Sequence, residues 1–253
     1  EVARLPNVTV MTRTTAIGYY HQNLVGLAQR LTDHLDSVPA DAPRERMWKV
    51  RAKEVVLAQG ALEKPLVFDG NDRPGVLLAG AAQTYLNRFG VKVGNRPVVV
   101  TAHDSAWHAA FDLAEAGAKP VAIVDVRPSV DRALAERACN LGIETLLGHT
   151  ASGTAGRLRV KSLRVNRTKG GKAGEARTIP CDAVLMCGGW TPCLHLFSHT
   201  QGKLTWDESL QVYLPGVKTE AVQIAGAGRG LWGIASALED GAAAGAAAAR
   251  DAG

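Results

Sequence analysis

Three short strand-like segments near the middle of the chain, separated by two helical patterns, constrain the fold more than any other feature of the sequence. Residues 97–101 and 120–126 are almost entirely apolar, as in strands that are buried on both faces of a sheet. Residues 143–147 predict a further strand. Residues 105–116 and 130–141 have helical spacing, and a glycine ends each of them. The order strand–helix–strand–helix–strand is half of a doubly wound parallel sheet, so we predict an α/β fold.

The flanking segments follow other patterns. Residues 13–20 are rich in β-branched and aromatic residues and predict a strand, whereas the apolar spacing over 24–35 favours an amphipathic helix. Residues 158–178 predict a β-hairpin with its tip at 169–172. The segment 234–250 is rich in alanine, which favours helix and close packing, so we predict a core helix there.

The composition excludes several classes of protein. The chain has 253 residues, of which 46% are apolar and 21% charged, so it can bury a core without disulfides or metal ions. Its net charge of +5 comes from scattered basic residues, which do not form the footprint of a nucleic-acid-binding surface. No segment approaches the roughly 20 uninterrupted apolar residues of a membrane span, and no signal peptide is present. We therefore expect a cytoplasmic protein that binds neither nucleic acid nor membrane.

The cysteines and histidines do not predict a metal site. The four cysteines are Cys139, Cys181, Cys187 and Cys193, and none forms the C-x-x-C spacing of a zinc site or a redox pair. His195 and His199 could lie on one face of a helix, but no third ligand is near them in sequence. We expect free thiols in a reducing compartment and no bound metal.

Two strand-to-helix turns have the context of a dinucleotide-binding fingerprint, G-x-G-x-x-G/A. In the first, residues 101–106, threonine and His103 stand at the first two glycine positions and only Ala106 fits the pattern. Asp125 follows about 20 residues later, where a ribose-binding carboxylate is expected. The order of elements is that of a nucleotide-binding half, but the phosphate cradle is missing. We predict a structural remnant at this turn.

The second turn matches the pattern formally. It comprises Gly228, Arg229, Gly230, Leu231, Trp232 and Gly233, and it follows a predicted strand at 221–225. Only 20 residues remain after it, too few for a complete strand–helix–strand unit. The start of a helix can still hold an anion. Two interpretations remain open, a cofactor-facing turn completed by chain elsewhere and a tight turn without a ligand.

Five strings of the sequence carry a resemblance to a known family. They are RTTAIGYYHQN (13–23), VVLAQGALEKPLVFDGNDRPGVLLAGAAQTYLNRFG (55–90), DSAWHAAFDLAEAG (104–117), CGGWTPCLHLFSHTQGKLTWD (187–207) and AGAGRGLWGIASALEDGAAAG (225–245). With these strings the chain resembles flavoproteins with two dinucleotide domains, of the thioredoxin-reductase and glutathione-reductase type. More narrowly, it resembles the alpha subunits of heterotetrameric sarcosine oxidases.

The resemblance implies an FAD/NAD(P)-binding-like Rossmann architecture with an insertion. Residues 1–66 would form a partial first nucleotide domain, residues 67–186 an inserted NAD-binding-like domain, and residues 187–253 the return to the first domain. The family's opening glycine fingerprint and its aminomethyltransferase-like region have no counterpart here, so we expect the chain to be a fragment.

The resemblance also implies a cofactor and a partner. Flavoproteins of this type end a late strand in Gly-Asp, whose carboxylate binds the ribityl chain of FAD, but this chain has Gly226-Ala227. The family's A-T-G-A signature is Ala58-Gln59-Gly60-Ala61 here. Since an alanine side chain cannot accept a hydrogen bond, we do not expect conventional FAD binding at this turn. This fits what the resemblance implies, an intact subunit that carries NAD and a partner beta subunit that carries FAD or FMN. We expect no cofactor to bind this chain alone.

By resemblance, the nucleotide would be held by residues from three parts of the chain. Thr14 and Thr15 would meet its adenine, and the remaining residues would line its pyrophosphate and ribose. These are Gly60, Gly226, Gly228, Arg229, Gly230, Leu231 and Trp232. The alternative for all of them is an ordinary strand and a tight turn with no ligand. No acid–base pair or activated nucleophile is recognisable in the sequence, so we predict no catalytic residue.

Three functions follow from the resemblance. The first is the non-catalytic, dinucleotide-binding-like part of a sarcosine oxidase, in which flavins of the complex perform the oxidation. The second is one component of an opine or amino-acid oxidase, or of a hydrogen-cyanide-synthase-like flavoprotein. The third is a docking scaffold whose nucleotide sites have decayed.

Overall fold

The computed structural model describes residues 2–169 and 172–253, and the chain divides into two compact units. The first unit combines the chain up to Leu62 with the chain from Thr191 onward, and the second unit is Glu63–Trp190. The predicted domain boundaries, after residues 66 and 186, both lie inside the second unit. The assignment of each part to a nucleotide domain stays a prediction. No described helix has the length and apolar composition that crossing a membrane requires.

The second unit is organised around a five-stranded sheet in which all neighbouring strands are parallel. Its strands, in spatial order, are β6 (Val76–Leu78), β13 (Ala183–Cys187), β7 (Pro97–Thr101), β8 (Ala122–Asp125) and β9 (Glu144–Leu147). Every residue of β7, β8 and β13 is buried, as their apolar sequences predict. The chain runs outward from β7 through β8 to β9, while β13 and β6 lie on the other side of β7. The predicted parallel α/β sheet is confirmed.

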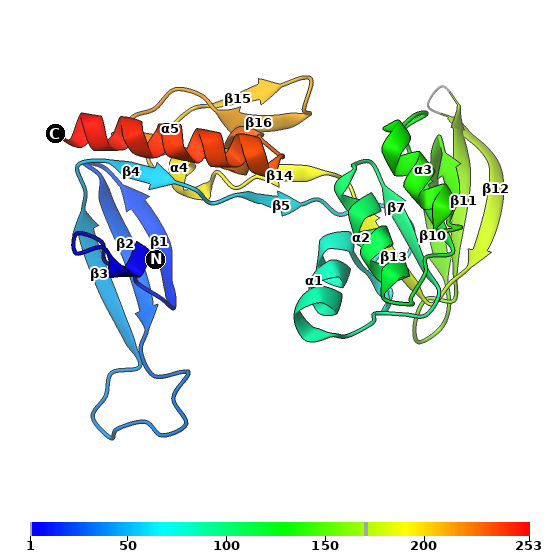
Figure 1. Cartoon of the computed structure of the whole chain (residues 1–253), viewed down its shortest axis with the longest axis horizontal. Coiled ribbons are helices and arrows are strands. Elements are labelled where there is room, and N and C mark those ends of the chain that lie inside the picture. The colour runs from blue at the N-terminus through cyan, green and yellow to red at the C-terminus, as the bar shows by residue number, and fades with distance from the viewer. Residues whose placement is uncertain (1, 170–171) are drawn as a thin grey trace. The chain divides into compact units, whose positions relative to one another are not determined.

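The two faces of this sheet are covered by different structures (Figure 1). The helices α1 (Ala79–Phe89), α2 (Ser105–Glu115) and α3 (Arg132–Asn140) cover one face, where Val99 and Ile123 pack against Trp107 and Phe111. On the other face an antiparallel sheet of β10 (His149–Ala155), β11 (Ser162–Lys169) and β12 (Lys172–Pro180) packs its apolar side chains on Val98, Val100 and Val124. A doubly wound sheet would carry helices on both faces. Of the predicted hairpin at 158–178, the strands are β11 and β12, and tip residues 170 and 171 lie outside the described residues.

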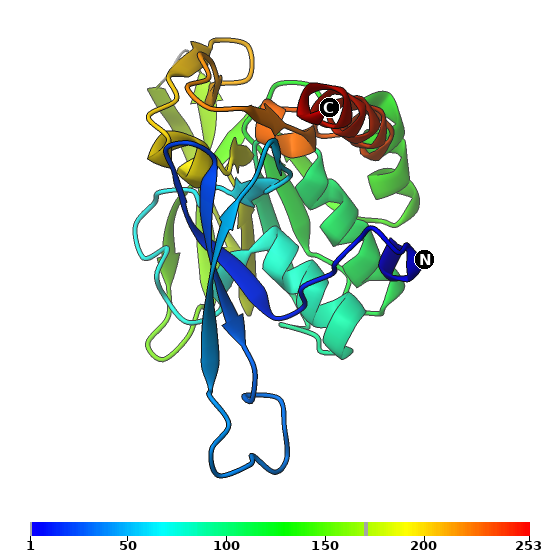
Figure 2. The same ribbon diagram turned by 90° about the vertical axis from the view of Figure 1, so that its left-hand side faces the viewer.

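The first unit contains a three-stranded antiparallel sheet of β1 (Thr14–Tyr20), β2 (Leu24–Arg30) and β3 (Glu45–Arg51). The predicted helix over 24–35 is therefore wrong. Gln22 and Asn23, both with positive φ, turn the chain back on itself, so that β2 pairs along its whole length with β1 and β3. Hydrogen bonding to two neighbours outweighs the helical spacing of the apolar residues. Figure 2 shows the three strands with the connection between β2 and β3, residues 31–44, extending beyond them.

The rest of the first unit surrounds a short parallel pair, β4 (Val55–Leu57) and β17 (Val222–Ile224). A 3-10 turn, Gly226–Arg229, follows β17 and leads to α5 (Ile234–Ala252). The antiparallel pair β15 (Leu204–Asp207) and β16 (Val212–Pro215) and the short helix α4 (His195–His199) complete the unit, with a further 3-10 turn at Val2–Arg4. Tyr19 and Phe197 are fully buried in its small core, beside Leu57 and Val222.

Two short strands mark the junctions between the units. They are β5 (Ala61–Glu63) and β14 (Trp190–Pro192), and they pair with each other. Next to them, the amide of Lys64 donates to the carbonyl of Gly189 at 2.8 Å, and the amide of Gly188 donates to the carbonyl of Lys64 at 2.7 Å. The chain therefore enters and leaves the second unit at one place.

Candidate functional site

The glycines predicted to line a nucleotide come together at the ends of two neighbouring parallel strands. Gly60 follows β4 and Gly226 follows β17, whose last residues Leu57 and Ile224 are register partners. Gly60 and Gly226 have φ of +72° and +66°, in the left-handed region that favours glycine. Gly228 is buried, and a Cβ on it would lie 3.0 Å from Ile224 Cγ2 and 4.0 Å from the carbonyl oxygen of Gly60. Crevices at the carboxyl ends of parallel strands are where α/β proteins bind ligands.

A carboxylate reaches this turn from α5. Asp240 Oδ2 accepts a hydrogen bond of 2.8 Å from the amide of Gly226, and Oδ1 forms an ion pair with the guanidinium of Arg229. The side chain of Asp240 is only 12% exposed. Gly226-Ala227 supplies no carboxylate in the strand, but the turn acquires one from a residue 14 positions later. The sequence reasoning missed Asp240, and the signal that could have found it is an isolated acidic pair within an alanine-rich helix.

A pocket of about 260 Å³ opens beside the turn. Its lining residues are Pro215, Gly216, Lys218, Gln223, Ile224 and Arg229. Lys218 Nζ donates to Gln223 Oε1 at 2.7 Å, and Arg229 is about half exposed. Two cations beside a turn rich in backbone N–H groups make this a place where an anion can bind.

The residues after Arg229 belong to the same turn and are partly buried. Gly230 has φ of +80°, and a Cβ on it would lie 2.8 Å from Leu210 Cδ1, so it packs closely on the connection between β15 and β16. Leu231 and Trp232 are half-buried where the turn leads into α5. The structure thus brings together seven of the nine predicted residues.

The other two predicted residues, Thr14 and Thr15, lie elsewhere in the first unit. They begin β1 and line a separate pocket of about 490 Å³, which contains none of the glycine-turn residues. Its other lining residues are Arg13, Arg30, Asp33 and His34. The hydroxyl of Thr14 donates to the carbonyl of Thr12 at 3.0 Å, whereas Thr15 is exposed.

In the second unit, the carboxylate at the ribose position is held by the protein itself. Asp125 is fully buried, and Arg127 donates to it from its amide at 2.9 Å and from its guanidinium at 2.7 and 3.0 Å. Trp107 Nε1 donates to its other side at 2.9 Å, and Arg127 also pairs with Asp104 at 2.7 Å. These contacts raise the pKa of Arg127 further above its usual value. Four donors within the protein therefore already occupy the carboxylate, and the structural remnant at this turn stays a prediction.

The reactivity of the four cysteines can test which side chains are buried. Cys181 and Cys187 are buried, and burial raises the pKa of each thiol to about 11, with Glu63 adding to the effect at Cys187. At pH 8 only on the order of one in a thousand of such thiols is ionised, and the thiolate is the nucleophile. We expect iodoacetamide at pH 8 to modify Cys139, which is exposed, and Cys193, which is half-buried, and to leave the two buried thiols unmodified.

Peptide mass spectrometry after brief labelling checks this expectation, and labelling in urea, where all four thiols should react, is the control. Modification of Cys187 as fast as Cys139 would show that the second unit opens readily.

Among the described residues, no three His, Cys, Asp or Glu side chains form a group that could hold a metal ion. His195 instead contacts Cys193, with Nδ1 and Sγ 3.2 Å apart.

Comparison with known sequences shows relatives along the whole chain. The chain is 42% identical over 261 aligned positions to the sarcosine oxidase alpha subunit of Corynebacterium sp. (strain P-1). This alignment covers 100% of this chain and 26% of that protein. The alpha subunit from Rhizobium meliloti (strain 1021) is 38% identical over 96% of this chain and 24% of its own length. An opine oxidase subunit from Agrobacterium tumefaciens (strain Ach5) is 27% identical over 74% of this chain. The chain thus spans about a quarter of the sarcosine oxidase subunits that it matches. No protein-family model matches it.

Comparison with solved structures identifies the fold. The thioredoxin reductase of T. acidophilum superposes with a TM-score of 0.63 at 20% identity, over 82% of this chain and 69% of that one. The Lactococcus lactis thioredoxin reductase gives a TM-score of 0.64 at 16% identity, over 94% of this chain and 74% of that one. The expected FAD/NAD(P)-binding-like Rossmann architecture is confirmed.

Proposed function

The whole chain is homologous to a segment that makes up about a quarter of the length of sarcosine oxidase alpha subunits. From this relationship we propose that it is the dinucleotide-binding-like, non-catalytic part of such a protein. In this proposal the glycine turn contributes to holding NAD, and the oxidation of the substrate amine takes place on flavins carried with a partner beta subunit. The relatives are oxidoreductases by name, and hydride acceptance is chemistry that a cofactor supplies.

One observation carries this proposal. Gly60 and the turn 226–232 meet at the carboxyl ends of β4 and β17, as a dinucleotide requires. Space for a ligand is present at Gly60, because a Cβ placed there would meet no atom within 4 Å. Arg229 and Lys218 border the adjoining pocket and offer positive charge to a pyrophosphate.

The residues of the turn fit NAD better than FAD. NAD, when bound, supplies a pyrophosphate and two riboses. Gly226-Ala227 lacks the carboxylate that holds the ribityl chain of FAD, and Asp240 is committed to the amide of Gly226 and to Arg229. Arg229 would hold a pyrophosphate oxygen, and the backbone of Gly60 would allow close approach. All of these residues bind or orient, and we assign none of them a catalytic role.

The first prediction for this function concerns Asp240. Asp240→Asn retains an oxygen that accepts the Gly226 amide, but it removes a negative charge and frees Arg229 to pair with phosphate. We expect NAD to bind about tenfold more tightly, which corresponds to roughly 1.4 kcal/mol. Glu239→Gln removes the same charge from the neighbouring exposed position of α5 and should leave the affinity unchanged.

The test uses a chimera in which this chain replaces the matching quarter of the Corynebacterium sp. (strain P-1) alpha subunit. Isothermal titration calorimetry of the assembled oxidase, with NAD and then with FAD, gives both affinities, and the unaltered oxidase is measured in parallel. Retained NAD binding that Asp240→Asn tightens supports the proposal. A chimera that assembles but no longer binds NAD would instead support the docking scaffold, the third function given above. The occupation of the Asp125 carboxylate by Arg127 and Trp107 favours that alternative.

A further inference from the structure

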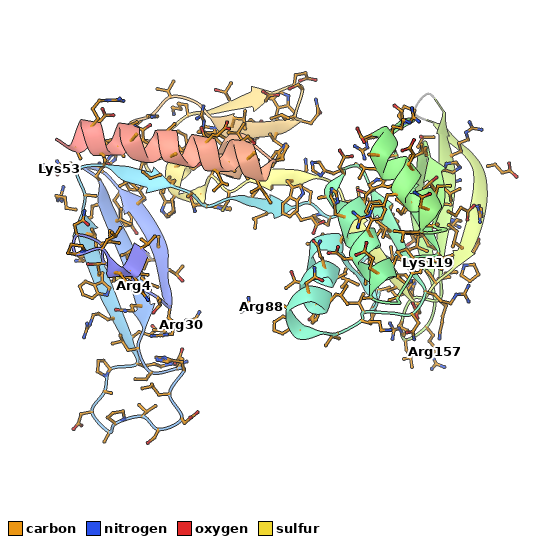
Figure 3. The ribbon with its side chains drawn as sticks, viewed as in Figure 1. Arg4, Arg30, Lys53, Arg88, Lys119 and Arg157 are labelled. Carbon is orange, nitrogen blue, oxygen red and sulfur yellow. The ribbon has the colours of Figure 1, made fainter. Side chains whose placement is uncertain are left out.

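The pocket at the start of β1 carries positive charge that no function described so far requires. It measures about 490 Å³, and Arg13, Arg30 and His34 contribute to its lining together with Thr14, Thr15 and Asp33. Arg30 lies on the β1–β3 sheet (Figure 3). All of these residues belong to the first unit.

The two arginines lie opposite each other where the chain enters β1 and β2 ends, Arg13 directly before β1 and Arg30 as the last residue of β2. Thr14 and Gln29 are register partners, and at the next position the amide of Arg30 donates to the carbonyl of Arg13 at 3.0 Å. Like charges at opposed positions of an antiparallel pair are destabilising. An anion between the two guanidinium groups removes this repulsion.

Arg13 has a second unfavourable feature, its backbone. Its φ of +54° lies in the left-handed region, where glycine or asparagine is favoured over a long side chain. Residues held in such conformations concentrate at sites that clamp ligands. The position therefore combines a like charge at the opposed position with a backbone conformation that disfavours a long side chain.

The nearby carboxylates leave the two arginines without an ion pair. Asp33 is bound to Arg44, whose Nε donates to it at 2.8 Å, and the pKa of Asp33 is lowered chiefly by that contact, with Arg30 and His34 adding to it. Glu45 stands opposite Arg30 in the register of β2 and β3, beside Arg44. Among the residues that the structure describes, none forms an ion pair with Arg13 or Arg30.

We propose that Arg13 and Arg30 form a phosphate-binding pocket, in which the exposed hydroxyl of Thr15 gives a further hydrogen bond. Guanidinium groups bind phosphate oxygens in pairs, and two of them match the charge of a phosphate monoester or pyrophosphate. The phosphate can come from a nucleotide, in which case the inference rests on the proposed nucleotide binding but moves the pyrophosphate from the glycine turn to this pocket, or from free phosphate. Both sources offer phosphate oxygens to the same two guanidinium groups, and the experiments below separate them.

Isothermal titration calorimetry of the chain with inorganic pyrophosphate tests the pocket. Arg13→Gln and Arg30→Gln should each raise the dissociation constant at least fivefold. The matched control is Arg46→Gln, which removes the same charge from β3 outside the pocket, where Arg46 lies over Trp48. It should change the constant less than twofold. Equal losses in all three variants, or no binding by the wild type, would overturn the proposal.

Thermal stability gives an independent signature. Without phosphate at low salt, Arg13→Gln relieves the repulsion and should melt at a temperature equal to or above that of the wild type. With saturating pyrophosphate the order should reverse, because only the wild type gains the bound anion. A variant that melts below the wild type under both conditions would indicate a structural role for Arg13 and would contradict the inference.

The source of the phosphate is settled by repeating the Arg13→Gln and Asp240→Asn substitutions in the chimeric oxidase with NAD. Dependence of NAD binding on Arg13 assigns the pocket to the nucleotide. Pyrophosphate binding that depends on Arg13, with NAD binding that does not, assigns it to a free phosphate. If the chimera binds no NAD but the pocket still binds pyrophosphate, the proposed function fails while this inference stands.

Discussion

Replacing Asp125 by leucine should lower the free energy of unfolding of the second unit by about 3–5 kcal/mol, because removing one partner of a buried ion pair leaves the other charge uncompensated. Asp125 is fully buried at the end of β8 and accepts hydrogen bonds from Arg127 and from Trp107 Nε1. Leucine has the same branched shape with no acceptor atoms, so the loss would come chiefly from the guanidinium and the indole N–H that remain without an acceptor.

Native-state hydrogen exchange of the amides in β7 and β8 measures this loss within the second unit alone. The control is Asp104→Asn, which removes the other carboxylate that pairs with Arg127. The side chain of Asp104 is 49% exposed, so we expect a cost below about 1 kcal/mol. A loss of that small size for Asp125→Leu would show that water reaches Arg127 and Trp107, and the site would then also be open to a ribose.

Replacing Asn23 by alanine should destabilise the first unit by about 3–4 kcal/mol. Asn23 is 4% exposed in the turn between β1 and β2. Its Nδ2 donates to the carbonyls of Lys53 at 2.9 Å and Ala221 at 3.1 Å, just before β4 and β17, and its Oδ1 accepts the hydroxyl of Tyr19 at 2.6 Å. The substitution leaves the hydroxyl of the buried Tyr19 and the carbonyl of Lys53 without this partner, and the carbonyl of Ala221 with only the amide of Val55 as donor. It also forces alanine into a φ of +52°.

Two variants separate these causes. Asn23→Gly loses the same hydrogen bonds without the backbone strain, so it should be about 1 kcal/mol less destabilising than Asn23→Ala. Tyr19→Phe removes only the hydroxyl, whose pKa burial raises to about 12, and should cost about 1–2 kcal/mol. Hydrogen exchange in β1, β4 and β17 reports all three. Equal effects of the alanine and glycine variants would mean that the turn relaxes, and a cost below about 1 kcal/mol for both would refute the anchoring role of Asn23.

The local sequence was sufficient to predict those strands and helices whose conformation depends only on neighbouring residues. The buried strands β7 and β8 and their helices follow from uninterrupted apolar segments and terminal glycines, and the structure has them at the predicted places. The spacing within 24–30 was misleading because the conformation of these residues is determined by pairing with β1 and β3, which no local pattern records. The sheet β10–β12, which covers the second face of the parallel sheet, was predicted only as a hairpin for the same reason.

The candidate site likewise contains residues that the local sequence identified and residues that it could not identify. Gly228 and Gly230 were identifiable from their spacing, and Gly226 only from the family resemblance. The φ values of +66° at Gly226 and +80° at Gly230 favour glycine at both positions. Asp240 was not identifiable, because its role depends on the helix carrying it back to a turn 14 residues earlier. Arg13 and Arg30 likewise acquire meaning only when the hairpin register places them opposite each other.

The paired strands β5 and β14 have a consequence for how such a chain can vary. Since Lys64 bonds to Gly188 and Gly189, the second unit begins and ends at adjacent points, as a domain inserted into a surface loop does. For the first unit, closing this loop is equivalent to closing a short hairpin, whatever the length of the insertion. The length and sequence of the second unit can therefore vary without changing the distance between the two chain ends that join it to the first unit.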